Sequence, residues 1–113
     1  MTVRIKRVYD PPTLKDGARV LVDRLWPRGL KKAEARIDRW MKEVAPSTAL
    51  RTWFGHEPAR FAEFRKRYAA EMADNPALAE LRKLGRGRTV TLLYAARDPA
   101  QNQAAVLLDL LRK

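Results

Sequence analysis

A short apolar run, Val20 to Val22, ends abruptly in the polar segment from Asp23 to Gly29. Consecutive apolar and β-branched residues predict a strand that is buried on both faces, which is typical of a parallel sheet covered by other elements. In open α/β sheets, ligands bind where the strands end and the loops begin. This boundary therefore predicts an α/β fold and, at the carboxyl end of the strand, a candidate binding site.

Two further strands are predicted near the ends of the chain. Residues 3–9 alternate apolar and basic side chains, as in an edge strand with one solvated face. Residues 89–96 are mostly apolar and predict the most deeply buried strand. With the strand at 18–23 and helical segments between the strands, the pattern predicts an α/β fold with a small, mainly parallel sheet of about three strands. We expect helices on both faces and a single domain over residues 1–113.

The segments between the strands carry apolar residues at helical spacing. Ser47 is expected to cap a short helix that ends at Gly55, and Asp98, followed by proline, is expected to cap the last helix. The expected helices cover residues 30–44, 48–54, 58–72, 76–84 and 99–111. Residues 35–38 are the weakest part of the first pattern, where irregular structure is the alternative.

Composition excludes several classes of site. The chain has no cysteine, so disulfides, thiolate nucleophiles and thiolate metal sites are excluded. His56 is the only histidine, which removes zinc sites built from several histidines and leaves only carboxylates for a hard cation. We predict no metal site and no cofactor. No apolar window approaches the length of a membrane span, so we expect a cytoplasmic protein without membrane contact.

The formal charge of +11 at pH 7 is compatible with two kinds of anionic partner. A small anionic ligand, such as a phosphate or a nucleotide-like molecule, would be attracted by clustered arginines. Nucleic acid would be attracted by a basic surface, but weakly and with a steep dependence on salt, because no base-reading element is recognisable. The positive residues are spread from Arg4 to Arg112 rather than gathered in one tail.

Parallel strands end at the same edge of a sheet, so residues that follow the strands at 18–23 and 89–96 should lie close together. The predicted ligand-binding residues are Asp23, Arg24, Trp26, Arg28, Tyr94, Arg97, Asp98 and Asn102. Secondary candidates are Ser47, Arg51 and His56. The amino end of the last helix would add backbone N–H groups for an anion. No residue is assigned a catalytic role.

Each of these residues also has a structural interpretation. Asp98 can act as a helix cap alone, and Asp23 can form an ion pair with Arg24 or Arg28. Trp26 offers either a stacking surface for a ring or a core contact, and the hydroxyl of Tyr94 either enters the site or packs. The sequence therefore favours a protein with a cleft for a phosphate or nucleotide-like anion and leaves open whether that cleft is catalytic. The alternative is a non-catalytic module that binds nucleic acid through its basic surface.

Several blocks of the sequence closely resemble the YeaO-like branch of the domain-of-unknown-function family 488. These blocks are RVLVDRLWPRG, LRTWFGHEP, FRKRYAAEM and TLLYAARD, and the resemblance extends from Lys6 to Leu111. It implies a small cytosolic α/β protein of bacterial type with no established reaction. The family pattern usually has a histidine where this chain has Gln101, so the resemblance does not carry chemistry that depends on that imidazole to this protein.

Overall fold

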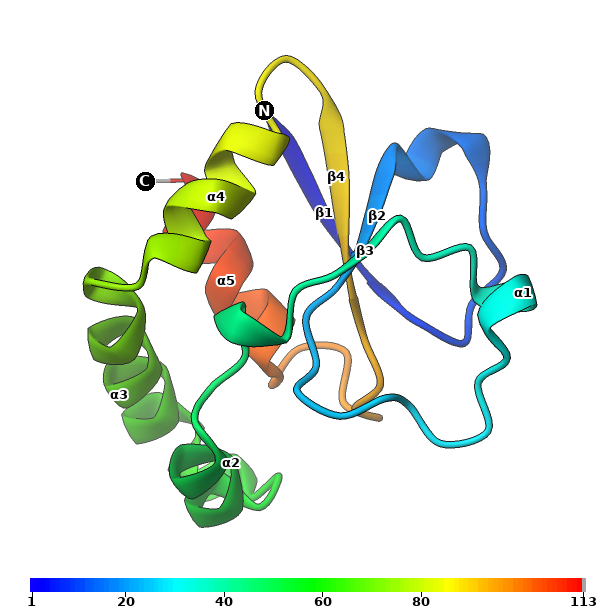
Figure 1. Ribbon diagram of the computed structural model, residues 1–113. Coiled ribbons are helices and arrows are strands. Elements are labelled where there is room, and N and C mark those ends of the chain that lie inside the picture. The colour runs from blue at the N-terminus through cyan, green and yellow to red at the C-terminus, as the bar shows by residue number, and fades with distance from the viewer. Residues whose placement is uncertain (113) are drawn as a thin grey trace.

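Four parallel strands form one sheet in the computed structural model, which describes residues 1–112 (Figure 1). The strands are β1 (Thr2–Arg7), β2 (Ala18–Leu21), β3 (Arg39–Trp40) and β4 (Thr89–Tyr94). Their order is β1-β4-β2-β3, so the strand with the most apolar sequence, β4, lies between β1 and β2. The predicted parallel α/β fold is confirmed, and β3 brings the sheet to four strands rather than about three.

Five α-helices accompany the sheet within residues 1–112. They are α1 (Lys32–Ala35), α2 (Thr48–Phe54), α3 (Phe61–Ala73), α4 (Pro76–Leu84) and α5 (Gln103–Arg112). Single 3₁₀ turns precede or connect them at Leu14–Asp16, Lys42–Val44 and Pro58–Arg60. The Oγ atom of Ser47 accepts a hydrogen bond of 3.1 Å from the N–H of Leu50, and Gly55 ends α2 in the left-handed conformation, both as predicted.

The prediction of a helix over residues 30–44 was wrong for most of that range. Only the four residues of α1 are α-helical, and Lys42–Val44 form a single 3₁₀ turn, because Arg36 adopts the left-handed conformation, with φ of 49°, and ends α1. The following residues pair with the open edge of β2, where the N–H of Met41 donates to the carbonyl of Leu21 over 2.9 Å. Hydrogen bonds to the backbone groups at the edge of β2 thus stabilise this segment more than the helix that its apolar spacing predicted.

Alternate residues of the strands enter two separate cores. Val20 and Leu92 face the cluster formed with α2 to α5, whereas Leu21 and Leu93 face a smaller cluster that includes Trp26 and Trp40. Helix α1 lies on the side of this smaller cluster, and α2 to α5 lie on the other side (Figure 1). Both faces of the sheet are therefore covered, as expected for an apolar parallel sheet.

The last helix begins later than the sequence indicated. Asn102, not Asp98, caps α5, because the Oδ1 atom of Asn102 accepts from the N–H of Ala105 over 2.9 Å. Oδ1 of Asp98 accepts from the N–H groups of Ala100 and Gln101 and closes a turn ahead of the helix. The predicted cap at Asp98 was wrong because this local hydrogen-bond pattern is shared by helix caps and by turns of the loop.

None of the helices within residues 1–112 has the length and apolar character needed to traverse a lipid bilayer.

Candidate functional site

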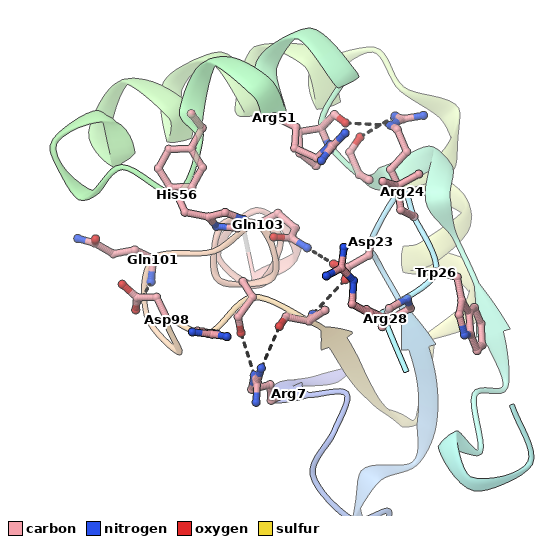
Figure 2. A pocket seen from close by; sticks show the side chains of 18 of the residues that line it. Arg7, Asp23, Arg24, Trp26, Arg28, Arg51, His56, Asp98, Gln101 and Gln103 are labelled. Carbon is pink, nitrogen blue, oxygen red and sulfur yellow. Dashed lines mark hydrogen bonds between the residues drawn. The ribbon is translucent and has the colours of Figure 1, made fainter. Parts of the chain in front are cut away.

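A cleft of about 760 Å³ opens at the carboxyl ends of the strands (Figure 2). Its walls come from the segment after β1, the loop after β2, helix α2 and its C-terminal turn, and the loop between β4 and α5. This position is the one where parallel α/β sheets bind ligands, and the volume is in the range of small-molecule sites, roughly 300 to 1,000 Å³.

Most of the sequence-predicted residues line this cleft. From the main set these are Asp23, Arg24, Trp26, Arg28, Arg97 and Asp98, and from the secondary set Arg51 and His56. Three candidates lie elsewhere. Tyr94 is buried in the core, Asn102 is buried and caps α5, and Ser47 caps α2 while its hydroxyl donates to Glu71 over 2.6 Å. The predicted residues that line the cleft therefore come from the loops after two strands and from the region around α2.

Sequence reasoning missed other residues of the cleft, notably Arg7, Tyr9, Gln101 and Gln103. Arg7 is the last residue of β1 and Tyr9 lies just after it, and β1 is parallel to β4 and therefore ends at the same edge of the sheet. Assigning a parallel direction to the first strand would have found them. Gln101 and Gln103 flank Asn102 on either side, and no pattern in the sequence distinguishes their orientation from that of their neighbour.

Two of the predicted residues hold the loop after β2 in shape. The guanidinium of Arg24 donates to the carbonyls of Pro46 and Ala45, over 3.1 and 3.2 Å. Trp26 packs edge-on against Trp40, with ring centroids 5.5 Å apart. The loop is thus tied both to the segment before α2 and to the smaller core, which makes it a defined wall rather than a flexible one.

Asp23 lies at the centre of this wall and forms no ion pair with Arg24 or Arg28 within residues 1–112. Its Oδ2 atom accepts from the N–H of Ala95 over 3.0 Å, and its Oδ1 atom accepts from the side-chain amide of Gln103 (Figure 2). Burial raises the pKa of Asp23 to about 6, against the opposing effects of these two hydrogen bonds and of the charge of Arg51. The site thus contains a carboxyl group that is costly to ionise.

This raised pKa predicts the stability of an Asp23→Asn variant. The contribution of Asp23 to stability is complete below its ordinary pKa of 3.8 and is lost as pH rises to about 6. An asparagine can still accept from Ala95 and face the amide of Gln103, so it avoids the cost of the charge. We expect the variant to be more stable than the native protein by about 1 to 2 kcal/mol above neutral pH, with no difference below about pH 4.

Urea unfolding across this pH range measures the effect, and Asp74→Asn is the control because Asp74 is exposed and lies outside the cleft. An Asp23→Asn protein less stable than the native protein at every pH would contradict the raised pKa.

Three guanidinium groups of the cleft have no partner among the described residues, 1–112. Arg28, Arg51 and Arg97 form no side-chain hydrogen bond or ion pair with any residue from 1 to 112, although all three line the cleft. Arg7, in contrast, donates to the carbonyls of Ala96 and Ala95 over 3.1 and 3.3 Å. The cleft therefore combines fixed arginines, which shape it, with arginines whose hydrogen-bond donors remain free.

His56 adds a constrained element to the rim. Its backbone φ is 58°, directly after Gly55 with φ of 53°, which places two successive residues in the left-handed region. The imidazole lies 5.9 Å from the ring of Phe54, a buried residue that also lines the cleft. No group of three or more histidine, aspartate or glutamate side chains able to hold a metal ion occurs within residues 1–112.

The fold and the site define a small, all-parallel α/β protein with an arginine-lined cleft at the strand ends. Comparison with known families makes the assignment specific, because the model described as "Inactive DUF488-N3 subclade" matches residues 2–113. The chain belongs to this DUF488 subclade, and the resemblance to the YeaO-like branch is confirmed.

Two relatives illustrate the range of the similarity. Uncharacterized protein YeaO of Escherichia coli is 47% identical over 113 residues, which covers 99% of this chain and 98% of the relative. Uncharacterized protein Rv3073c of Mycobacterium tuberculosis is 51% identical over 109 residues, covering 96% and 92%. No solved structure matches the chain significantly.

Proposed function

We propose that the cleft binds a small phosphorylated ligand and that the protein acts as a binding protein rather than as an enzyme. The observation that carries the proposal is the set of free guanidinium groups of Arg28, Arg51 and Arg97, which come from three separate segments. Unpaired arginines around one cleft are suited to phosphate, because each guanidinium offers several donors in a planar fork.

The charge balance of the cleft supports an anionic ligand. Five arginines line it against two carboxylates, those of Asp23 and Asp98. The Asp98 carboxylate is already occupied by two backbone N–H groups, which lower its pKa, and burial raises the pKa of Asp23 to about 6. The net positive potential at the carboxyl ends of the strands therefore favours a ligand with one or two negative charges.

A non-catalytic role is supported by the description of the subclade as inactive. It is also supported by Gln101, which lines the cleft, because the resemblance to the YeaO-like branch implies a histidine at this position in most relatives. A glutamine amide forms hydrogen bonds but does not exchange protons near neutral pH, so it cannot replace an imidazole in general acid or base catalysis.

Thermal unfolding with inorganic phosphate tests the proposal. Phosphate should raise the melting temperature of the native protein, and much less that of Arg28→Ala or Arg97→Ala, because each lost charge-assisted hydrogen bond weakens binding by about 1.5 to 3 kcal/mol. Arg86→Ala is the matched control, since Arg86 is an exposed arginine in the turn before β4, at the opposite edge of the sheet.

Equal stabilisation of all four proteins would contradict the cleft as the site. The anion would then act on positive charge distributed over the surface of the molecule. Distributed surface charge of this kind is also what weak, salt-dependent nucleic-acid binding would use.

A further inference from the structure

The polar groups at the centre of the cleft differ in kind from those at its rim. The rim offers hydrogen-bond donors, namely the free guanidinium groups of Arg28, Arg51 and Arg97. The centre offers acceptors, because Asp23 and Gln103 point toward each other there and share a hydrogen bond (Figure 2). A ligand that only accepts hydrogen bonds would satisfy the rim and leave the centre unmatched.

The central acceptors have capacity to spare. Each carboxylate oxygen of Asp23 accepts one hydrogen bond, from Ala95 or from Gln103, and can accept another. The Oε1 atom of Gln103 accepts no hydrogen bond from any residue in the range 1–112. Every fully buried side-chain polar atom of that range has a partner, so the unpartnered Oε1 atom of Gln103 is reachable from solvent. Asp23 is half-buried and lines the cleft. A ligand that pairs with these acceptor atoms needs hydrogen-bond donors, such as hydroxyl groups.

The cleft also has an apolar side. Leu25 is 61% exposed and Tyr9 is 41% exposed, and both line the cleft. They are two of the four large hydrophobic side chains exposed on residues 1–112. Phe54 lines the cleft as well. The volume of about 760 Å³ is far larger than a phosphate ion needs, so the cleft has room for an organic group attached to the anion.

We propose that the ligand is a ribosyl phosphate, whose phosphate group binds the rim arginines while its sugar hydroxyls donate to Asp23 and Gln103. This inference rests on the proposed binding of phosphorylated ligands in the same cleft. The arrangement gives the two halves of the ligand complementary partners, which neither inorganic phosphate nor an unphosphorylated sugar would find. Free sugar phosphates and nucleotides both supply this chemistry.

Isothermal titration with defined probes tests the inference near neutral pH. Ribose 5-phosphate should bind at least about tenfold more tightly than inorganic phosphate, since hydrogen bonds to a charged carboxylate are among the stronger ones. Deoxyribose 5-phosphate, which lacks one hydroxyl, should fall between them. Adenosine 5′-monophosphate distinguishes the source: tighter binding than ribose 5-phosphate assigns a nucleotide and weaker binding assigns a free sugar phosphate, and both results support the ribosyl phosphate.

The decisive variant is Asp23→Asn. Removing the negative charge should leave the affinity for inorganic phosphate unchanged or increase it, while the preference for ribose 5-phosphate over phosphate should fall to about threefold or less. Gln103→Ala should reduce the same preference without changing the charge. Arg97→Ala should weaken all phosphorylated probes together, and Arg86→Ala should weaken none of them.

The possible failures are distinguishable. If inorganic phosphate binds in a manner that depends on Arg97, but ribose 5-phosphate binds no more tightly, the ribosyl phosphate is ruled out and the anion site survives. An unchanged preference in both Asp23→Asn and Gln103→Ala also overturns the assignment of the hydroxyl contacts. If no phosphorylated probe binds the native protein, both proposals fail.

Discussion

A Leu92→Asp substitution should leave no folded protein. Leu92 is fully buried at the middle of β4, where its neighbours in the adjacent strands are Ile5 and Val20. The change removes a packed leucine, at a cost of about 2 to 5 kcal/mol. It also buries a carboxylate without a partner, which adds several kcal/mol. The total approaches or exceeds the stability of a small domain, about 5 to 15 kcal/mol.

Circular dichroism and a urea titration measure the result. The control is Ala62→Asp, which introduces the same side chain at an exposed position in the first turn of α3 and should leave stability nearly unchanged. A Leu92→Asp protein with a native spectrum and a cooperative transition would mean that β4 is not the centre of the fold.

Asp16→Asn should cost about 3 to 5 kcal/mol of stability at neutral pH, because it leaves a buried arginine without its counter-charge. Asp16 and Arg19 are both buried, and the guanidinium of Arg19 donates to Oδ2 of Asp16 over 2.5 Å. Lys6 forms a second ion pair with the same carboxylate at 3.2 Å. Arg19 also donates to the carbonyl of Ala35 over 2.9 Å, so the pair connects β2 with helix α1.

The same pair makes stability depend on pH. Burial alone would raise the pKa of Asp16, but hydrogen bonds from Thr13, Lys6 and Arg19 outweigh it and hold the pKa well below its usual 3.8. A depressed pKa contributes stability above the unfolded value, and this contribution is lost as pH falls below about 4. The difference between native and Asp16→Asn proteins should therefore shrink in acid.

Urea unfolding at neutral and acidic pH checks this expectation. Asp109→Asn is the matched control, because Asp109 forms an exposed ion pair with Arg65 and its loss should cost less than about 1 kcal/mol. A cost for Asp16→Asn no greater than that of the control would show that the buried pair contributes no more than a surface one.

The sequence predicts the sheet well where consecutive residues are apolar, since such runs are stable only when both faces are covered. β4 and β2 fall in this class, and their parallel pairing follows from the helices between them. The prediction for residues 30–44 was wrong because the apolar residues of this segment fit a helix as well as they fit the observed short strand. What decides its structure is the open edge of β2, a partner distant in sequence that no local pattern reveals.

The cleft residues show the same difference between what local patterns predict and what depends on distant contacts. Asp23, Arg28 and Arg97 were predicted together because they follow strands whose carboxyl ends meet. Arg7 was missed since the direction of its strand was not used, although the parallel pairing of β1 with β4 places it at the same edge. The hydrogen bond between Gln103 and Asp23 depends on side-chain orientation at the start of α5, which sequence alone does not determine.

Because all four strands run in the same direction, the cleft lies at the carboxyl ends of the strands and the amino ends lie together on the opposite side of the sheet. Met1 and the turn around Arg86 lie at the amino ends of β1 and β4, with Met1 against Gly85, far from the strand ends that line the cleft (Figure 1). An affinity tag or surface tether attached ahead of Met1 would therefore leave the cleft facing solution. Immobilised protein would keep the cleft accessible, so capture experiments with small ligands or with larger partners can be run in that orientation.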